Sequence, residues 1–215
     1  GWQHNCYDGY LHVKPVVFWQ QENLLQQYLP NLDRYIVLSD YDKRDYMEKL
    51  GIDCEVKINP RSFVSEKKCD VKSKRFLMAT RFVYAKGLDL MMESFEEFCK
   101  EDSEWELDII GDGDLFDQIR ADAKKRHLEK RVHFVGYTNE PEKYYLNSSV
   151  FLLPSRWEGW PMVIMEAFEF GLPVIAYHMG AMDLIIDDGK TGFLPEAFDP
   201  HKFAQAMLKL AHDEE

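Results

Sequence analysis

The chain has 215 residues, which is enough for more than one minimal core but too few for two full-sized α/β domains. Its 26 Lys and Arg residues stand against 38 Asp and Glu residues, and the net charge of −12 argues against general binding to a nucleic-acid backbone. No apolar run approaches the roughly 18 residues of a membrane span. The four cysteines form no CxxC pair or Cys/His cluster that would predict a zinc site.

Residues 34–58 contain a short strand–helix–strand pattern. Arg34–Leu38 (RYIVL) is predicted to be a strand. Ser39 has a side chain suited to capping a helix, so a helix is expected to begin there and to end near Leu50, with Gly51 as its closing residue. Cys54–Ile58 is expected to be a second short strand.

Asn59–Ser73 interrupts this pattern with a proline and two long polar stretches, and five Lys or Arg residues lie between Lys67 and Arg75. This composition predicts an exposed linker. We interpret its basic residues as a solvated surface and not as a binding patch.

After the linker, apolar strands and amphipathic helices alternate regularly. Strands are expected at Phe76–Ala79, Leu107–Ile110, Val132–Val135, Val150–Leu153, Val174–Ala176 and near Phe193. Helices are expected at Gly87–Lys100, Leu115–His127, Glu140–Leu146, Pro161–Phe170 and Pro200–Ala211. Continuous apolar strands separated by helices indicate a parallel α/β sheet covered by helices on both faces. Ligands of such sheets bind at the carboxyl ends of the strands, so the loops that follow the strands are the candidates for a site.

One of these loops resembles a dinucleotide fingerprint without completing it. Gly111-Asp112-Gly113 follows a strand and opens a helix, but the position that needs a third glycine is Phe116, which argues against a Rossmann NAD site. Asp112 and Asp114 could supply two carboxylates to a metal. A polar βα turn with an acidic helix start explains them equally well, and we predict no metal site.

The loop Arg81–Gly87 (RFVYAKG) carries two cations five residues apart, after a strand and before a helix. A guanidinium and an ammonium on one such loop can grip two phosphate groups of a diphosphate. Taken alone, the loop is explained equally well by charges that face solvent.

The segment Pro154–Ala167 (PSRWEGWPMVIMEA) is more specific. It follows a buried strand, and Pro161 is expected to start a helix. The early N–H groups of that helix include those of Met162 and Val163, and a helix start of this kind accepts anions.

Two carboxylates flank this helix start. Glu166 shares a face with Met162 and Val163, and its side chain leans toward the helix N-terminus. Glu158 lies eight residues earlier, beside Gly159. The helix dipole would stabilise Glu166 without any ligand, but it explains Glu158 and its glycine less well.

Four motifs in a fixed order carry a resemblance to a known family. They are TRFVYAKGLDLMMESF, IIGDGD, VHFVGY and SRWEGWPMVIMEAFEFGLPVIA, the last of which contains Glu158-x7-Glu166. From about Phe76 to Leu194 they resemble the donor-binding half of the family 4 glycosyltransferases of the GT-B fold.

This resemblance implies a Rossmann-like parallel sheet and a division of the chain. Residues 1–59 would be the end of the N-terminal, acceptor-side domain, 60–73 the linker, and 74–215 the C-terminal nucleotide-sugar-binding domain. His4, in GWQHNCYD, would be the active-site histidine of the N-terminal domain. The chain is therefore expected to be a fragment, with weak or no transferase activity by itself.

The resemblance also implies roles for individual residues. Arg81 and Lys86 would hold the donor diphosphate, Glu166 would bind the ribose hydroxyls, and Glu158 would contact the transferred sugar. The catalytic set would then be Arg81, Lys86, Glu158 and His4. The other nucleotide-sugar contacts would come from Gly136 and Tyr137 near the nucleobase, and from Gly159, Trp160, Met162 and Val163.

Our hypothesis is that this chain is the nucleotide-sugar-binding part of a retaining hexosyltransferase. That enzyme would use a UDP-hexose as donor and a glycan or a lipid-linked molecule as acceptor. The expected donor site needs no metal or cofactor. We expect a cytoplasmic protein, with peripheral membrane contact through the rest of the N-terminal domain and no nucleic-acid partner. The alternatives are a GT-B-fold nucleotide-sugar epimerase and a non-catalytic binding module.

Overall fold

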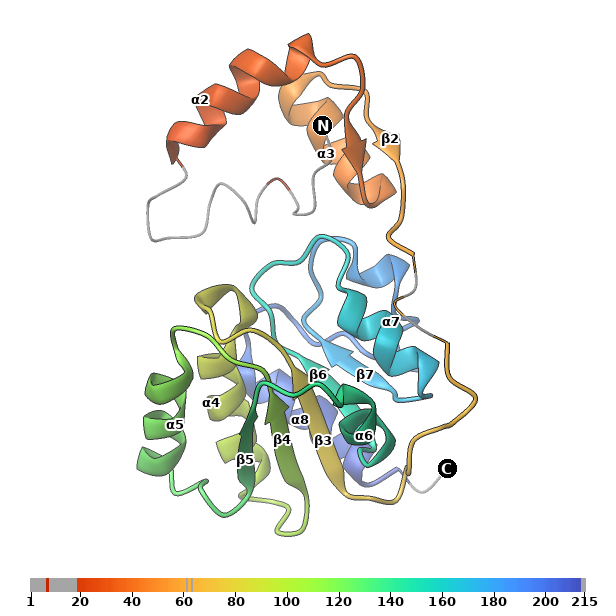
Figure 1. Ribbon diagram of the computed structural model, residues 1–215. Coiled ribbons are helices and arrows are strands. Elements are labelled where there is room, and N and C mark those ends of the chain that lie inside the picture. Colours follow the sequence, from red (N-terminus) through yellow and green to blue (C-terminus); the bar gives the residue numbers. More distant parts are fainter. Residues whose placement is uncertain (1–6, 8–18, 61, 63, 214–215) are drawn as a thin grey trace. The chain divides into compact units, whose positions relative to one another are not determined.

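The computed structural model describes residues 7, 19–60, 62 and 64–213, which fall into two compact units (Figure 1). The first unit comprises Gly1–Pro60, Trp157–Met162 and Met179–Ala181. The second comprises Arg61–Arg156, Val163–His178 and Met182–Glu215. No helix in the described part of the chain has the length and apolarity needed to cross a bilayer.

The first unit is built on a two-stranded parallel sheet. Its elements are α2 (Trp19–Tyr28), the 3₁₀ turn η1 (Leu29–Asn31), β1 (Ile36–Val37), α3 (Asp40–Leu50) and β2 (Glu55–Val56). The two expected strands are therefore present but short. Helix α2 was not predicted, because its polar sequence WQQENLLQQY has no apolar stripe of helical period.

Helix α3 begins and ends where its caps predict. The Ser39 hydroxyl accepts a hydrogen bond from the Asp42 backbone N–H at 3.0 Å, which satisfies one of the orphan donors at the helix start. Gly51 ends the helix in the left-handed conformation, with φ 66°.

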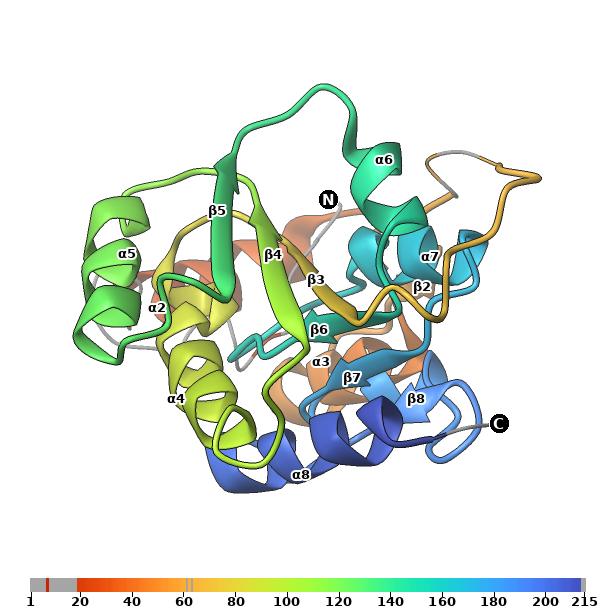
Figure 2. The ribbon, with the colours of Figure 1, turned by 90° about the horizontal axis from the view of Figure 1, so that it is seen from below.

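The second unit contains a six-stranded parallel sheet. Its strands are β3 (Arg75–Ala79), β4 (Glu106–Ile110), β5 (Val132–Gly136), β6 (Val150–Leu153), β7 (Val174–Ala176) and β8 (Gly192–Phe193). Its α-helices are α4 (Leu88–Phe98), α5 (Phe116–Lys125), α6 (Pro141–Leu146), α7 (Met162–Glu169) and α8 (Pro200–Ala211). The expected α/β alternation is confirmed throughout this unit. Figure 2 shows α4 and α8 on one side of the sheet and α6 and α7 on the other.

The strand order is β5-β4-β3-β6-β7-β8. From β3 the chain first builds outward through β4 and β5, and then crosses to the other side of β3 to begin β6. The direction of winding thus reverses between β3 and β6. In an open parallel sheet, the crevice outside the carboxyl ends of two such strands is the usual ligand site.

Aromatic side chains fill the core of the second unit beside β3. Phe76 is fully buried and packs edge-on against Phe95 and Phe98 of α4, with ring centroids 6.3 and 5.1 Å away. Trp105 lies 4.5 Å from the same ring. This packing holds α4 against the sheet and so fixes where the loop between β3 and α4 begins and ends.

The segment before β3 is exposed, as expected, but its backbone is hydrogen-bonded to later parts of the second unit. The Ser65 N–H donates to the Glu169 carboxylate, and the N–H groups of Cys69 and Asp70 donate to backbone carbonyls of Phe170 and Leu146, all within 2.9 Å.

Four of the five basic residues of this stretch have partners within the protein, and the side chains of Lys67 and Lys74 remain mostly exposed. Lys67 pairs with Glu142 at 3.2 Å, Lys68 donates to a backbone carbonyl, Lys74 pairs with Glu104, and Arg75 pairs with two acidic residues of β4. These partners lie on elements that come later in the chain, so the composition of the segment alone did not reveal them.

Candidate functional site

A pocket of about 340 Å³ lies where the winding of the sheet reverses. It is lined by the ends of four strands or the residues just after them, with Ala79 from β3, Ile110 from β4, Tyr137 after β5 and Leu153 from β6. Arg81, Lys86 and Val163 line the same pocket. Four of the predicted donor-site residues, Arg81, Lys86, Tyr137 and Val163, are therefore brought together.

The β3–α4 loop is shaped by a 3₁₀ turn, η2 (Tyr84–Lys86), and by Gly87. Gly87 has φ 63°, and a Cβ atom built there would lie 2.0 Å from the carbonyl oxygen of Pro154. Only glycine fits this conformation and this contact. The loop after β3 and the loop after β6 therefore touch backbone to backbone beside the pocket.

Arg156 holds these two loops together. Its guanidinium makes a two-pronged contact with the Asp89 carboxylate at 2.8 and 2.5 Å and donates to the Tyr84 carbonyl at 2.9 Å. It also stacks over the Tyr84 ring, 4.0 Å from the centroid, and its backbone N–H donates to the Ala85 carbonyl. Burial by itself would raise the pKa of Asp89, but hydrogen bonding to Arg156 and the charge of the guanidinium lower it below its usual value. These contacts fix the backbone that carries Lys86.

The turn after β4 approaches the β3–α4 loop closely. A Cβ atom on Gly111, which has φ 125°, would lie 1.8 Å from the Thr80 carbonyl oxygen. The Asp112 carboxylate accepts a hydrogen bond from the Gly113 N–H at 2.8 Å, and Asp114 is exposed. The glycines of this turn thus serve the close approach of two loops at the pocket wall.

Glu166 lies in α7, one turn beyond Val163. Its Oε2 accepts a hydrogen bond from the Tyr145 hydroxyl at 2.9 Å. Tyr145 is fully buried, and its ring stacks between those of Phe151 and Phe170, with centroids 5.8 and 5.2 Å away. The carboxylate predicted to bind ribose is therefore held by a hydrogen bond from the buried, stacked side chain of Tyr145.

The remaining predicted residues have different positions. Gly136 lies beside the pocket, where its carbonyl accepts from the Gly111 N–H, and the Tyr137 side chain is 78% exposed. Glu158, Gly159, Trp160 and Met162 belong to the first unit, so the two units share the Glu158-x7-Glu166 motif between them. His4 lies outside the described residues.

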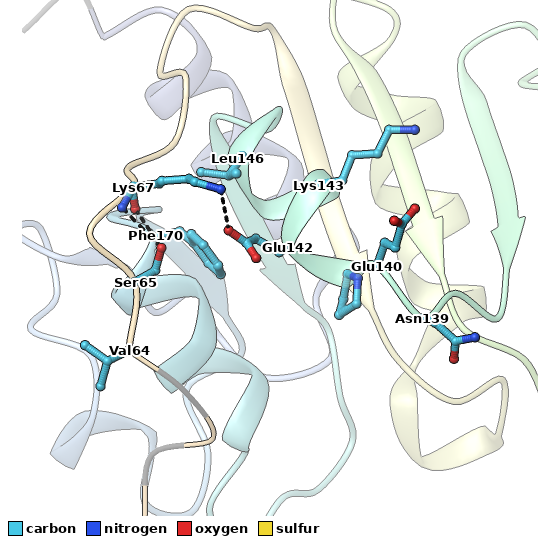
Figure 3. A pocket seen from close by; sticks show the side chains of 10 residues that line it. Val64, Ser65, Lys67, Asn139, Glu140, Glu142, Lys143, Leu146 and Phe170 are labelled. Atoms are coloured by element: carbon cyan, nitrogen blue, oxygen red, sulfur yellow. Dashed lines mark hydrogen bonds and ion pairs between the residues drawn. The ribbon is translucent and has the colours of Figure 1, made fainter.

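A second pocket, of about 550 Å³, lies between the segment before β3 and helix α6 (Figure 3). Lys67 and Glu142 form an ion pair at its edge, and Leu146 and Phe170 contribute apolar side chains. It is larger than the pocket at the sheet, but it contains none of the predicted site residues. We therefore place the candidate site at the carboxyl ends of the strands.

Tyr145 and Arg156 are two residues of the site that the sequence did not predict. Arg156 stands next to the sequence WEGW and so could have been singled out, but its partner Asp89 is 67 residues away. Tyr145 lies in a short helix, and its sequence context does not distinguish it from any other aromatic residue of a core. Its partner Glu166 is 21 residues away. Neither contact follows from local spacing.

Solved structures place this architecture in a class. The chain superposes over its whole length on 44% of a TarM variant from Staphylococcus aureus, with a TM-score of 0.87 at 23% identity. It also matches the lipopolysaccharide outer core galactosyltransferase WaaB, with a TM-score of 0.70 and 25% identity over 85% of the chain and 54% of WaaB. The second unit thus has the Rossmann-like parallel sheet of a GT-B glycosyltransferase.

The family follows from the sequence itself. The model of the glycosyl transferases group 1 matches residues 62–215, and the chain belongs to this family. A glycosyltransferase of Haemophilus influenzae is 27% identical over 85% of this chain and 53% of its own length. An α-1,3-galactosyltransferase of Escherichia coli is 33% identical over 49% of this chain and 27% of its own. The chain thus spans about half or less of these relatives.

Proposed function

We propose that the chain is the nucleotide-sugar-binding part of a retaining family 4 hexosyltransferase, which moves a hexose from a UDP-sugar to a glycan or lipid-linked acceptor. The observation that carries the proposal is the pocket between β3 and β6. There Arg81 and Lys86 line the same cavity as Val163, in the first turn of α7. Two cations and a helix start around one cavity suit a diphosphate.

Two relatives support a UDP-sugar as the donor. The Escherichia coli relative is named as a UDP-Gal-dependent galactosyltransferase that acts on a GlcNAc-diphosphoundecaprenol. The TarM variant was solved with UDP and an α-GlcNAc-glycerol. An undecaprenol-linked acceptor of that kind also supports an enzyme that works in the cytoplasm at the inner face of the membrane.

In the proposed reaction, the bond between the sugar C1 and the diphosphate oxygen breaks, and C1 bonds to an acceptor hydroxyl oxygen on the same face. The configuration at C1 is thereby retained, and the hydroxyl proton leaves with the diphosphate. Arg81 and Lys86 stabilise the charge that grows on the diphosphate, which removes the need for a metal ion. Glu158 contacts hydroxyls of the transferred sugar, and His4 acts on the acceptor side.

The proposal is tested by titrating UDP calorimetrically into the 215-residue chain and two variants. Glu166→Ala should weaken UDP binding by about 1.5–3 kcal/mol, because a carboxylate bonded to ribose hydroxyls is lost. Glu158→Ala should leave UDP affinity within about 0.5 kcal/mol, because UDP lacks the sugar that this residue contacts. Equal losses in the two variants would contradict this division of roles.

The wild-type titration decides the proposal as a whole. A chain that does not bind UDP would overturn the assignment of the pocket. Transfer itself is measured on a longer protein that includes the complete N-terminal domain. Release of free sugar without use of an acceptor by that protein would favour a nucleotide-sugar epimerase.

A further inference from the structure

The two helices beside the pocket both begin at its wall. Pro141, the first residue of α6, lines the pocket, and so does Val163 in the first turn of α7. One helical turn farther on, α6 presents Tyr145 and α7 presents Glu166. The hydrogen bond from the Tyr145 hydroxyl to Glu166 Oε2, at 2.9 Å, therefore joins the two helices one turn beyond the residues that line the pocket, and neither Tyr145 nor Glu166 is itself among those lining residues.

The hydroxyl of Tyr145 is an unusually well-fixed donor. The ring stacks nearly parallel between Phe151 and Phe170, with interplanar angles of 16° and 17°. The side chain is fully buried, and burial is the main cause that raises the pKa of Tyr145, with the charge of Glu166 next. The hydroxyl thus keeps its proton and can only donate to the carboxylate, which cannot give one back while ionised.

A glutamate side chain has three rotatable bonds, and a carboxylate that binds two neighbouring hydroxyls must be held in one orientation to do so. Its neighbours on the same face of α7, three residues away, are Val163 and Glu169, and neither an alkyl side chain nor an ionised carboxylate can donate a hydrogen bond to Glu166. Tyr145 supplies that hydrogen bond from another helix. A fixed partner lowers the conformational entropy that ligand binding would otherwise cost.

We infer that Tyr145 is the positioning residue that orients the Glu166 carboxylate toward the ribose hydroxyls of the nucleotide, and so sets the preference of the pocket for a ribonucleotide. This inference rests on the proposed function, because it takes the ribose as the ligand of Glu166. Tyr145 itself touches no substrate.

The test compares UDP with 2′,3′-dideoxy-UDP, which lacks both hydroxyls, by calorimetric titration of the full 215-residue chain. Tyr145→Phe keeps the stacked ring and removes only the hydroxyl. We expect this variant to bind UDP about three- to tenfold more weakly than the wild type. Its affinity for the dideoxy ligand should change by less than about twofold, so the ratio of the two affinities shrinks.

Two further variants separate positioning from a general loss of structure. Tyr177→Phe removes another buried tyrosine hydroxyl from the same unit and should leave the ratio unchanged. Glu166→Ala should abolish the preference for UDP, and adding Tyr145→Phe to it should cause no further loss, because the two residues act as one group.

The outcomes distinguish the two proposals. If the wild type does not bind UDP, the proposed function fails and this inference falls with it. If the wild type prefers UDP and Glu166→Ala loses that preference while Tyr145→Phe keeps it, the proposed function stands and the role of Tyr145 is overturned.

Discussion

The two units treat a buried carboxylate in opposite ways. In the second unit, Asp108 of β4 is 7% exposed and is paired with the Arg75 guanidinium at 3.0 Å. In the first unit, Asp42 is 2% exposed and its partner is the neutral hydroxyl of Ser39, at 2.6 Å. Burial is the main cause that raises the pKa of Asp42 to about 6.

The two buried carboxylates thus differ in whether a positive charge lies beside them. The second unit compensates a buried charge with another charge, and it carries Arg81 and Lys86 at the pocket proposed for the nucleotide. The first unit instead buries the Asp42 carboxylate beside the Ser39 hydroxyl that caps α3, without a basic partner among the contacts described above. We therefore expect UDP affinity to depend on the second unit, and pH-dependent stability to be a property of the first.

The largest effect is expected in the core of the second unit. Phe76→Ala should lower the free energy of unfolding by about 3–5 kcal/mol, because it leaves a cavity among the three aromatic rings of Phe95, Phe98 and Trp105. Urea unfolding followed by circular dichroism measures the loss, with Val71→Ala as the control at a 64% exposed position. A loss under about 1 kcal/mol would contradict the assignment of the main core to this site.

A smaller effect is expected from Asp42, and it depends on pH. Because its pKa rises from 3.8 to about 6 on folding, the folded chain binds the proton more tightly than the unfolded chain. Below pH 3.8 Asp42 does not change the free energy of unfolding. As the pH rises from 3.8 to about 6, the group lowers the free energy of unfolding progressively, and above that pH the loss stays constant. The full cost is on the order of 3 kcal/mol, at 1.36 kcal/mol for each pKa unit.

Asp42→Asn removes this titration. The difference in unfolding free energy between variant and wild type should therefore grow in favour of the variant between pH 4 and 6.5, as measured by urea unfolding across that range. UDP affinity should stay within about twofold of the wild type. A difference that does not change with pH, or a large change in UDP affinity, would break the contrast between the units.

The smallest effects test the proposal that the donor site needs no metal. Arg81→Ala should weaken UDP binding by about 1.5–3 kcal/mol, as loss of a charge-assisted hydrogen bond does. Asp114→Asn should change it by less than about 1 kcal/mol, and excess chelator should leave it intact. Arg120→Ala, at an exposed position on α5, is the matched control for loss of an arginine.

The opposite result is equally clear. If chelator abolishes UDP binding and Arg81→Ala does not weaken it, a metal ion holds the diphosphate. The loop between β3 and α4 would then carry its two cations for another reason.

Local signals were sufficient for most of the elements. The strands Val150–Leu153 and Val174–Ala176 and the helix Pro200–Ala211 have the bounds that their sequence predicts. Ser39 and Gly51 cap α3 as expected, because caps depend on residues within one turn of the helix end. Helix α2 was not predicted, because no apolar stripe distinguishes it from a polar loop.

The sequence by itself determined the α/β alternation, the caps of α3, and the loops that carry Arg81, Lys86 and Glu166. These follow from periodicity and from interactions between near neighbours in the chain. Only the tertiary structure decided that β3 and β6 are adjacent, that Arg156 joins Asp89, and that Tyr145 supports Glu166. The physical reason is that such contacts join residues 21 or more positions apart, and packing of the whole sheet selects them.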